Sequence, residues 1–404
     1  LVNIMCYKMS GNNMDIDDIV PSFLKKDKKE NIDLSKFPLR VAIICPYSMS
    51  IPGGVQNQVI LQMEFLRKAG IDARIIAPCD GVPPNQYIIP VGTTRAIRGN
   101  GSLAPIADGI DVTSMTLGAI YNFTPDVLHL HEPMIPGPTI AAMLGADLPM
   151  VATFHAAGEG SQALRYFQAP ARGAISRVQI KVCVSSEAKA LAEKFMPGDY
   201  EVIANAININ EYKNIVKWPH IKPIVMFVGR HEDRKGLRFL IDAWLDSEIT
   251  QNNFDLWVAG SGEETASLIS KTTHCKSIHF VGRVDDKELK RRLASAEILI
   301  APATGGESFG IILLEAMVSD CAIIASDIPG YAGVVRNNLE AILVEPGNVD
   351  LLRKSLEELI LNKPKRDELK ENAKKRVKEF SIEKIVENYR DVYESAIELH
   401  RSLV

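Results

Sequence analysis

The sequence predicts an α/β protein made of two doubly wound domains, each built on a mainly parallel sheet. The chain has 404 residues, which is more than one ordinary hydrophobic core can serve. Residues 40–77 have the pattern strand, glycine-containing turn, helix, strand, which is typical of a βαβ unit and therefore of a parallel sheet. The same pattern restarts at residue 223, after a junction near residues 210–219.

The composition indicates a globular protein with no general affinity for nucleic acid. The formal net charge is −4, and no apolar run reaches the roughly 18 residues of a membrane-spanning helix. No signal peptide is recognisable at the start, and the six cysteines are scattered without a Cys-x-x-Cys pair. We therefore expect a cytoplasmic protein with reduced thiols, without a disulfide framework or a zinc site.

The first domain is expected over residues 39–212, after a disordered polar tail at residues 1–38. It opens with a strand at 40–45, a helix at 55–68 and a strand at 73–77. The glycine-rich residues 92–111 are expected to be irregular. Further strands are expected at 86–90, 126–130, 150–154, 179–184 and 200–203.

The second domain is expected over residues 220–380, and residues 381–404 form a closing amphipathic helix. The charged residues 363–379 before that helix are expected to be a solvated helix face. A further helix is expected at 308–318. Strands are expected at 223–228, 254–259, 277–281, 297–301, 321–325 and 341–344.

The most informative stretch is residues 305–315, Gly-Gly-Glu-Ser-Phe-Gly-Ile-Ile-Leu-Leu-Glu, which follows a buried strand. Its glycines leave backbone N–H groups open at the start of a helix, where an anion is stabilised. Glu307 lies in the loop, and Glu315 is placed about two turns inside the helix. A carboxylate beside a phosphate site needs hydroxyl groups to bind, so this stretch predicts a sugar-nucleotide site.

Arg230 and Lys235 flank a loop that follows the first strand of the second domain. Two cations there can neutralise a diphosphate leaving group, as a metal ion does in other enzymes. The alternative is an ordinary pair of surface charges. Asp285 lies in residues 282–286 after another strand, where backbone groups are placed to contact a base edge.

The first domain offers two further candidates at the carboxyl ends of strands, where ligands bind in open α/β sheets. Gly53 and Gly54 open the first helix and allow the backbone to approach a pyrophosphate or a sugar, unless they only form a tight turn. They do not form the Gly-x-Gly-x-x-Gly signature, which disfavours a dehydrogenase. His155 is placed to hydrogen-bond a sugar hydroxyl, with a structural histidine as the alternative.

His129 and His131 lie on one side of their strand, which admits a metal pair. No third ligand has convincing spacing. We therefore expect structural hydrogen bonding here and no metal.

Taken together, these residues resemble the retaining glycosyltransferases of the GT-B fold, of the glycosyltransferase family 4 type. Within that family the chain is most similar to the actinobacterial phosphatidylinositol mannosyltransferases. The resemblance runs from about residue 40 to the C-terminus and rests on residues 45–48, 52–56, 129–133, 152–155 and 305–310. It implies two Rossmann-like domains that face a cleft, with the last helix crossing back to the first domain.

The resemblance also implies the roles of individual residues. Arg230 and Lys235 would stabilise the leaving diphosphate, and Glu315 would hold the ribose hydroxyls. His155 would be needed for turnover. The donor would also be contacted by Gly54, Asp285, Gly306, Glu307, Ser308, Phe309, Gly310 and Ile311, and the acceptor by Tyr47, Gln56 and His155.

The implied reaction moves a hexose, with retention of configuration, to an acceptor hydroxyl. The favoured version is mannose from GDP-mannose to phosphatidylinositol, by a metal-independent monomer that contacts the cytoplasmic face of the plasma membrane. The acceptor side departs from the family, because residues 92–122 contain only Arg95 and Arg98 as cations, with Asp108 and Asp111 opposing them. The expected basic residues are also missing from positions 156–161. The alternatives are another nucleotide sugar with a different lipid, glycan or soluble acceptor, or a nucleotide-binding protein or dehydrogenase without transfer activity.

Overall fold

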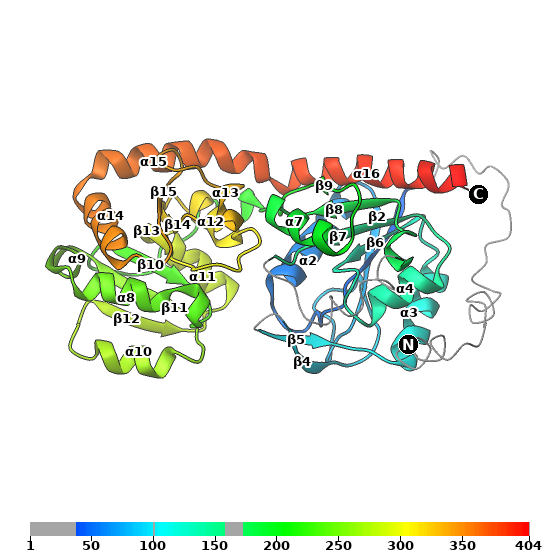
Figure 1. Cartoon of the computed structure of the whole chain (residues 1–404), viewed down its shortest axis with the longest axis horizontal. Helices are drawn as coiled ribbons and strands as arrows, with labels where there is room; N and C mark the ends of the chain where they lie inside the picture. Colours follow the sequence, from blue (N-terminus) through cyan, green and yellow to red (C-terminus); the bar gives the residue numbers. More distant parts are fainter. Residues whose placement is uncertain (1–37, 100–101, 158–172, 404) are drawn as a thin grey trace. The chain divides into compact units, whose positions relative to one another are not determined.

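The computed structural model describes residues 38–99, 102–157 and 173–403, which form two compact α/β units (Figure 1). Unit 1 contains the described residues up to Val184, residues Ala188–Ile203 and the C-terminal residues from Ile385. Unit 2 contains Ser185–Glu187 and Ala204–Lys384. The predicted fold class is confirmed, since each unit is built on its own parallel sheet. All of the predicted tail except Pro38 lies outside the described residues.

Unit 1 has a seven-stranded sheet in the order β3-β2-β1-β6-β7-β8-β9, and all neighbouring strands are parallel. Its central strands are almost entirely buried, as is usual for a parallel sheet covered on both faces. The strands are β1 (Arg40–Ile44), β2 (Asp72–Ala77), β3 (Ile88–Pro90), β6 (Val127–His131), β7 (Met150–Phe154), β8 (Ile180–Cys183) and β9 (Glu201–Val202). The helices placed wholly or mainly in unit 1 are α2 (Gly54–Lys68), α3 (Ile110–Phe123), α4 (Pro138–Gly145), α7 (Ser186–Phe195) and α16 (Ile382–Leu403).

Unit 2 has a six-stranded parallel sheet in the order β12-β11-β10-β13-β14-β15. Its strands are β10 (Ile224–Val228), β11 (Asp255–Ala259), β12 (Ile278–Gly282), β13 (Ala296–Ala301), β14 (Ala322–Ser326) and β15 (Ala341–Val344). Its α-helices are α8 (Leu237–Leu245), α9 (Glu248–Asn253), α10 (Thr265–Thr272), α11 (Asp286–Leu293), α12 (Ile311–Val318), α13 (Pro329–Ala332), α14 (Val349–Leu361) and α15 (Lys363–Arg376). The 3-10 helices are η4 (Ile209–Tyr212), η5 (Asp233–Lys235) and η6 (Val377–Phe380).

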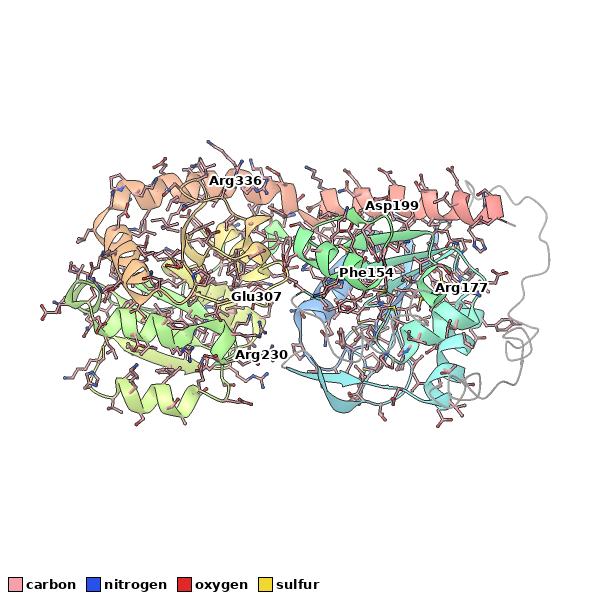
Figure 2. All side chains as sticks on the ribbon, viewed as in Figure 1. Phe154, Arg177, Asp199, Arg230, Glu307 and Arg336 are labelled. Atoms are coloured by element: carbon pink, nitrogen blue, oxygen red, sulfur yellow. The ribbon has the colours of Figure 1, made fainter. Side chains whose placement is uncertain are left out.

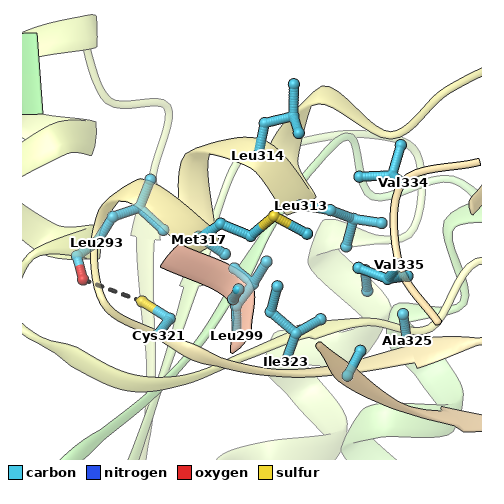
Figure 3. Packing of buried hydrophobic residues seen from close by; sticks show 14 of the residues in the cluster. Leu293, Leu299, Leu313, Leu314, Met317, Cys321, Ile323, Ala325, Val334 and Val335 are labelled. Carbon is cyan, nitrogen blue, oxygen red and sulfur yellow. Dashed lines mark hydrogen bonds between the residues drawn. The ribbon is translucent and has the colours of Figure 1, made fainter. Parts of the chain in front are cut away.

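Helix α12 is anchored in the core of unit 2 by its apolar side chains. Leu313 and Met317 are buried in one cluster with Leu299 of β13 and Ile323 of β14 (Figure 3). Cys321, at the entry to β14, is buried in the same cluster, and its Sγ donates to the carbonyl of Leu293 at 3.3 Å. This packing fixes the loop that precedes α12 against the sheet.

The start of α12 differs from the prediction, because the helix begins at Ile311 and not at Ser308. Gly310 is the N-cap and has a left-handed φ of +83°, where a Cβ atom would lie 2.6 Å from the ring of Tyr331. Ser308 and Phe309 therefore belong to the loop. Glu315 lies about one turn inside the helix and not two.

The prediction that residues 92–111 are irregular was wrong for the middle of this segment. It contains a two-stranded antiparallel sheet of β4 (Arg95–Gly99) and β5 (Ser102–Ile106). Both strands of a two-stranded sheet have a free edge, where a residue such as Pro105 is tolerated.

The junction of the two units lies earlier than residues 210–219, because residues from Ala204 onward belong to unit 2. The N–H of Ile207 donates to the carbonyl of Phe380 at 2.9 Å. The N–H of Trp218 donates to Ser295 Oγ at 2.7 Å. These long-range hydrogen bonds attach the junction to unit 2. They join residues far apart in the chain, so no local sequence pattern predicts them.

Helix α16 continues to Leu403, and its residues from Ile385 onward pack within unit 1. Its buried face carries Tyr389 and Tyr393. Over the described residues, no helix has both the length and the hydrophobicity that crossing a membrane requires.

Candidate functional site

The strand order of each sheet identifies where a ligand would bind. In unit 1 the chain builds outward from β1 to β3 and then returns to place β6 on the other side of β1. In unit 2 it builds outward from β10 to β12 and returns to place β13 beside β10. Ligands of open α/β sheets bind beyond the carboxyl ends of the strands at such switch points. The loops after β1 and β6, and after β10 and β13, are therefore the candidate sites.

In unit 2 the two switch-point loops are tied to each other by their backbones. The N–H of Thr304, after β13, donates to the carbonyl of Arg234, after β10, at 2.8 Å. Gly236 has a φ of +70°, and a Cβ atom there would lie 1.9 Å from the carbonyl oxygen of Pro302. Only glycine allows this approach. Gly236 therefore lets the loop that contains Arg234 and Lys235, the cationic loop, pack against the loop that contains Glu307, the glutamate loop.

Glu307 is the centre of the charged cluster in unit 2. One oxygen of its carboxylate, Oε1, lies 2.7 Å from Lys235 Nζ and 2.7 Å from Arg234 Nη1. The Glu307 side chain is only 13% exposed, while those of Lys235 and Arg234 are 22% and 32% exposed. The remaining N–H donors of the two cations can therefore bind a second anionic group beside the carboxylate.

The expected contact of Arg230 with a diphosphate stays a prediction, and the structure adds Arg234 to the charged cluster. Arg230 lies at the same edge of unit 2 as Glu307 (Figure 2), but its guanidinium pairs with Glu232 at 2.5 Å and is 46% exposed. Arg234, which the sequence reasoning did not single out, makes the contact to Glu307 together with Lys235. The two cations are adjacent in the single 3-10 turn of η5, and the only signal for Arg234 in the sequence was its position next to Lys235.

The backbone of the glutamate loop is held as closely as its side chains. A Cβ atom on Gly330 would lie 1.8 Å from the carbonyl oxygen of Glu307, so the loop packs directly on the start of α13. Gly306 has a φ of +70°, which favours glycine. The Phe309 ring is buried and lies 5.9 Å from that of Phe380. The side chain of Phe309 is thus part of the core, and only its backbone is left for a donor contact.

Glu315 lies on α12, half-buried beneath the loop, and its Oε1 accepts a hydrogen bond from the hydroxyl of Tyr212 at 3.4 Å. Burial, with the nearby charge of Asp286, raises the pKa of Glu315 to about 7. Its neutral form is therefore populated at physiological pH. A carboxyl group in this state can donate as well as accept hydrogen bonds, which suits a pair of hydroxyls.

Asp285 has a structural role in addition to the expected base contact. It is the N-cap of α11, and its Oδ1 accepts the N–H of Glu288 at 2.7 Å. The expected contact of this region with a base stays a prediction.

In unit 1 the switch point carries a buried cluster of histidines. His129 is fully buried on β6, with Nδ1 2.8 Å from the Tyr393 hydroxyl and Nε2 2.7 Å from Thr153 Oγ1. Both ring nitrogens are used, which confirms the predicted structural hydrogen bonding. Burial lowers the pKa of His129 to about 3, so the ring is neutral.

His131 and His155 form a pair at the ends of β6 and β7. His131 Nδ1 lies 2.9 Å from His155 Nε2, and the two rings stack with centroids 5.2 Å apart. The backbone N–H of His155 donates to Glu132 Oε1 at 2.9 Å. Burial lowers the pKa of His155 to about 3 and raises that of Glu132 to about 7. Near neutral pH His155 is therefore uncharged and part of the Glu132 population is protonated, so these buried side chains carry little net charge.

The remaining candidates of unit 1 lie near this cluster or in the loop after β1. Gln56 is buried and donates through Nε2 to the carbonyl of Ile51 at 3.2 Å, which braces the loop before α2. Gly54 is the first residue of α2. Burial, followed by the nearby charges of Glu132 and Cys45, holds the pKa of Tyr47 well above its usual value. Tyr47 therefore lies close enough to Glu132 for the carboxylate charge to disfavour ionisation of the Tyr47 hydroxyl. The departure at residues 156–161 falls mostly outside the described residues.

Among the described residues, no three His, Cys, Asp or Glu side chains are grouped so that they could hold a metal ion.

Two family models match the chain over most of its length. "Glycosyltransferase Family 4" matches residues 52–211, and "Glycosyl transferases group 1" matches residues 208–376. The two matches meet near the junction between the units.

Curated relatives are similar over most of the chain. The phosphatidyl-myo-inositol mannosyltransferase of Mycobacterium leprae is 30% identical over 362 residues, which cover 88% of this chain and 97% of that protein. The protein of the same name from Propionibacterium freudenreichii is 32% identical over 314 residues, covering 74% and 80%.

Solved structures share the fold at lower identity. A glycosyltransferase from Rickettsia africae superposes with a TM-score of 0.69 at 18% identity, over 89% of this chain and 99% of that chain. Anabaena HepE in complex with UDP and glucose superposes with a TM-score of 0.69 at 16% identity, over 88% and 100%. The sheets, the switch-point loops and these relatives agree: the chain belongs to the GT-B glycosyltransferases of the family 4 type and is a hexosyltransferase.

Proposed function

We propose that this glycosyltransferase transfers mannose from GDP-mannose to a hydroxyl of phosphatidylinositol, with retention of anomeric configuration. The observation that carries the proposal is the 30% identity to a phosphatidyl-myo-inositol mannosyltransferase, which extends over 97% of that relative. The charged cluster around Glu307 supplies the donor chemistry that this reaction requires.

In the proposed reaction the bond between the sugar C1 and the diphosphate oxygen breaks, and a bond from C1 to the acceptor oxygen forms. The acceptor oxygen approaches the face from which the diphosphate leaves, and its proton passes to the departing diphosphate. Negative charge develops on that diphosphate, so Lys235 and Arg234 stabilise it, with Arg230 at the same loop. Glu307 holds both cations in place before the donor arrives, which reduces the reorganisation that binding needs.

The proposal also includes the remaining donor contacts. The N–H groups at the start of α12, near Gly310 and Ile311, would bind a phosphate, and Glu315 would bind the ribose hydroxyls. Three cationic side chains at the switch point supply the positive charge that a divalent metal supplies in other transferases. We therefore propose that the reaction is metal-independent. From the similarity to phosphatidyl-myo-inositol mannosyltransferases, we further propose that the protein acts as a monomer that meets its lipid acceptor at a membrane surface.

The purified chain should be assayed against a panel of nucleotide sugars, with vesicles that contain phosphatidylinositol or phosphatidylglycerol. We expect mannosyl transfer with GDP-mannose and phosphatidylinositol vesicles, an α-linked product by NMR, and unchanged turnover in EDTA. Thermal stabilisation by GDP, UDP, ADP and NAD identifies the base independently, because a ligand that binds the folded state raises its stability.

Each outcome decides one part of the proposal. Transfer from a UDP-sugar alone would replace the donor, and transfer to phosphatidylglycerol or to free sugars would replace the acceptor. Stabilisation by NAD, without transfer from any sugar donor, would overturn the proposal as a whole.

A further inference from the structure

The protonation of the paired histidines of unit 1, His131 and His155, follows from their burial. Both rings are buried, with 2% exposure for His131 and 7% for His155. Burial lowers the pKa of each imidazole below its usual value. Each ring is therefore neutral and carries one N–H, so each has one donor nitrogen and one acceptor nitrogen.

The hydrogen bond between the two rings admits only two arrangements. Either His131 Nδ1–H donates to His155 Nε2, or His155 Nε2–H donates to His131 Nδ1. In the second arrangement the proton of His131 lies on Nε2, and that atom is buried without a hydrogen-bond partner among the described residues. A buried N–H without an acceptor is rarer and more costly than a buried lone pair without a donor. The first arrangement is therefore favoured.

No neighbouring ring relieves the orphaned nitrogen. The ring centroid of His129 lies 4.2 Å from that of His131, but both nitrogens of His129 are already bonded, to Tyr393 and Thr153. His131 Nε2 thus remains a lone pair, and His131 Nδ1 carries the proton.

We infer that His131 is a positioning residue that fixes the tautomer of His155, so that His155 carries its proton on Nδ1. Its Nε2 lone pair is occupied by His131, and its Nδ1 is a donor. Only the Nδ1–H of His155 is then left for a substrate, so His155 can donate a hydrogen bond to a substrate oxygen and has no free lone pair with which to act as a general base. The substrate oxygen belongs to the hexosyl donor or its acceptor, a step that rests on the proposed function, whereas the tautomer does not.

The surrounding backbone keeps this pair in register. His131 lies beside Thr153 in the β6–β7 ladder, and the N–H of Glu132 donates to the carbonyl of Thr153 at 2.8 Å. Glu132 adopts a left-handed φ of +49°, which is uncommon for a residue with a side chain, and its carboxyl group accepts the backbone N–H of His155. A strained residue persists only where its surroundings determine its conformation. Glu132 therefore holds the backbone of His155, and His131 holds its ring.

The tautomer can be read directly in the wild-type protein. Two-bond ¹H–¹⁵N spectra of ¹⁵N-histidine-labelled protein distinguish a protonated Nδ1 from a protonated Nε2, and His155→Gln assigns the signal among the eight histidines. We expect Nδ1–H for His155 and Nδ1–H for His131. Protonation of His155 at Nε2 in the folded wild-type protein would overturn the inference, whatever sugar the enzyme transfers.

Substitutions of His131 test the positioning role. His131→Asn keeps an amide N–H near the position of Nδ1, whereas His131→Leu removes the donor at similar volume. We expect His131→Leu to lose the single His155 tautomer and to reduce kcat roughly 10-fold with little change in the donor KM, and His131→Asn to retain both. His274→Leu, an exposed histidine of unit 2, is the matched control.

The readouts separate this inference from the proposed function. Absence of mannosyl transfer in the wild-type protein would contradict the proposed function and leave the tautomer result standing. Equal kcat and an unchanged His155 tautomer in a folded His131→Leu protein would contradict the positioning role. If His131→Leu fails to fold, the His155 tautomer of the wild-type protein still tests the inference, because a proton on His155 Nε2 would contradict it.

Discussion

The two switch points of this protein use opposite physical strategies. The one in unit 2 gathers ions, Glu307 with Lys235 and Arg234, whose side chains stay partly exposed to solvent. The one in unit 1 gathers His129, His131 and others in full burial, where the rings are kept neutral. The difference follows from the free-energy cost of desolvating a charge. The partly exposed charges of unit 2 largely avoid this cost, and the buried imidazoles of unit 1 avoid it by losing their protons.

This comparison predicts how each region responds to substitution. Partly exposed ion pairs contribute little to stability, so changes around Glu307 should affect binding and turnover and leave the fold intact. Buried hydrogen bonds are costly to leave unmade, so changes around His129 should affect stability first. The following predictions test this division, from the largest effect to the smallest.

Glu307→Ala should have the largest effect. Loss of the carboxylate releases Lys235 and Arg234 and removes a proposed sugar contact, so we expect kcat/KM to fall by about 100- to 1,000-fold. The melting temperature should be unchanged within a few degrees. Steady-state kinetics and thermal unfolding measure the two quantities, with the exposed Glu358→Ala as control. Wild-type turnover in the variant would show that the donor site has been misplaced.

Lys235→Met should reduce kcat/KM by roughly 100-fold, because an ammonium group that stabilises the leaving diphosphate acts most strongly in the transition state. Arg234→Met should reduce it less, by roughly 10-fold, since that side chain is more exposed. Lys271→Met, which breaks a surface pair with Asp242, serves as the control. The expectation that this cluster serves turnover and not stability would be contradicted by a larger loss of kcat/KM in the control. Loss of folded protein in Lys235→Met would contradict it as well.

Glu315→Gln should change the pH dependence of stability. The folded-state pKa of Glu315, about 7, lies above the unfolded value of about 4.5, so the folded state binds the proton more tightly. Its contribution is present below pH 4.5 and is lost as the pH rises through 7. Relative to wild type, the variant should therefore gain up to about 3 kcal/mol between pH 4.5 and pH 8. Urea unfolding at both pH values measures this, and an equal difference at the two values would contradict it.

Tyr393→Phe should have the smallest effect on activity and a moderate effect on stability. The Tyr393 hydroxyl bonds His129 Nδ1 at 2.8 Å and receives Gln62 Nε2 at 3.2 Å, so its loss should cost about 1 kcal/mol. Tyr389→Phe removes a longer contact, 3.2 Å to Thr153, and should cost less. Denaturation midpoints compare the two, and transfer activity should stay within a few-fold. A loss of turnover in a stable Tyr393→Phe protein would show that the buried network takes part in catalysis.

Much of this architecture was accessible from local patterns. The buried strands were predicted within about two residues of their observed ends, because parallel strands covered on both faces appear as continuous apolar runs. Glu307 and Lys235 were selected because they follow such strands, and the structure brings the two together. Arg234 was missed because three cations lie within six residues, Arg230 to Lys235, and the sequence does not say which of them a 3-10 turn directs to Glu307.

The sequence by itself determined the fold class, the family and the loops proposed to bind the donor, since these depend on periodicity, glycine placement and short motifs. Tertiary structure alone decided the protonation of the site. His131, His155 and Glu132 are ordinary titratable residues until burial shifts their pKa values and one hydrogen bond fixes where a proton lies. Burial and cross-strand distance arise from contacts between residues far apart in the chain, and a linear pattern does not contain them.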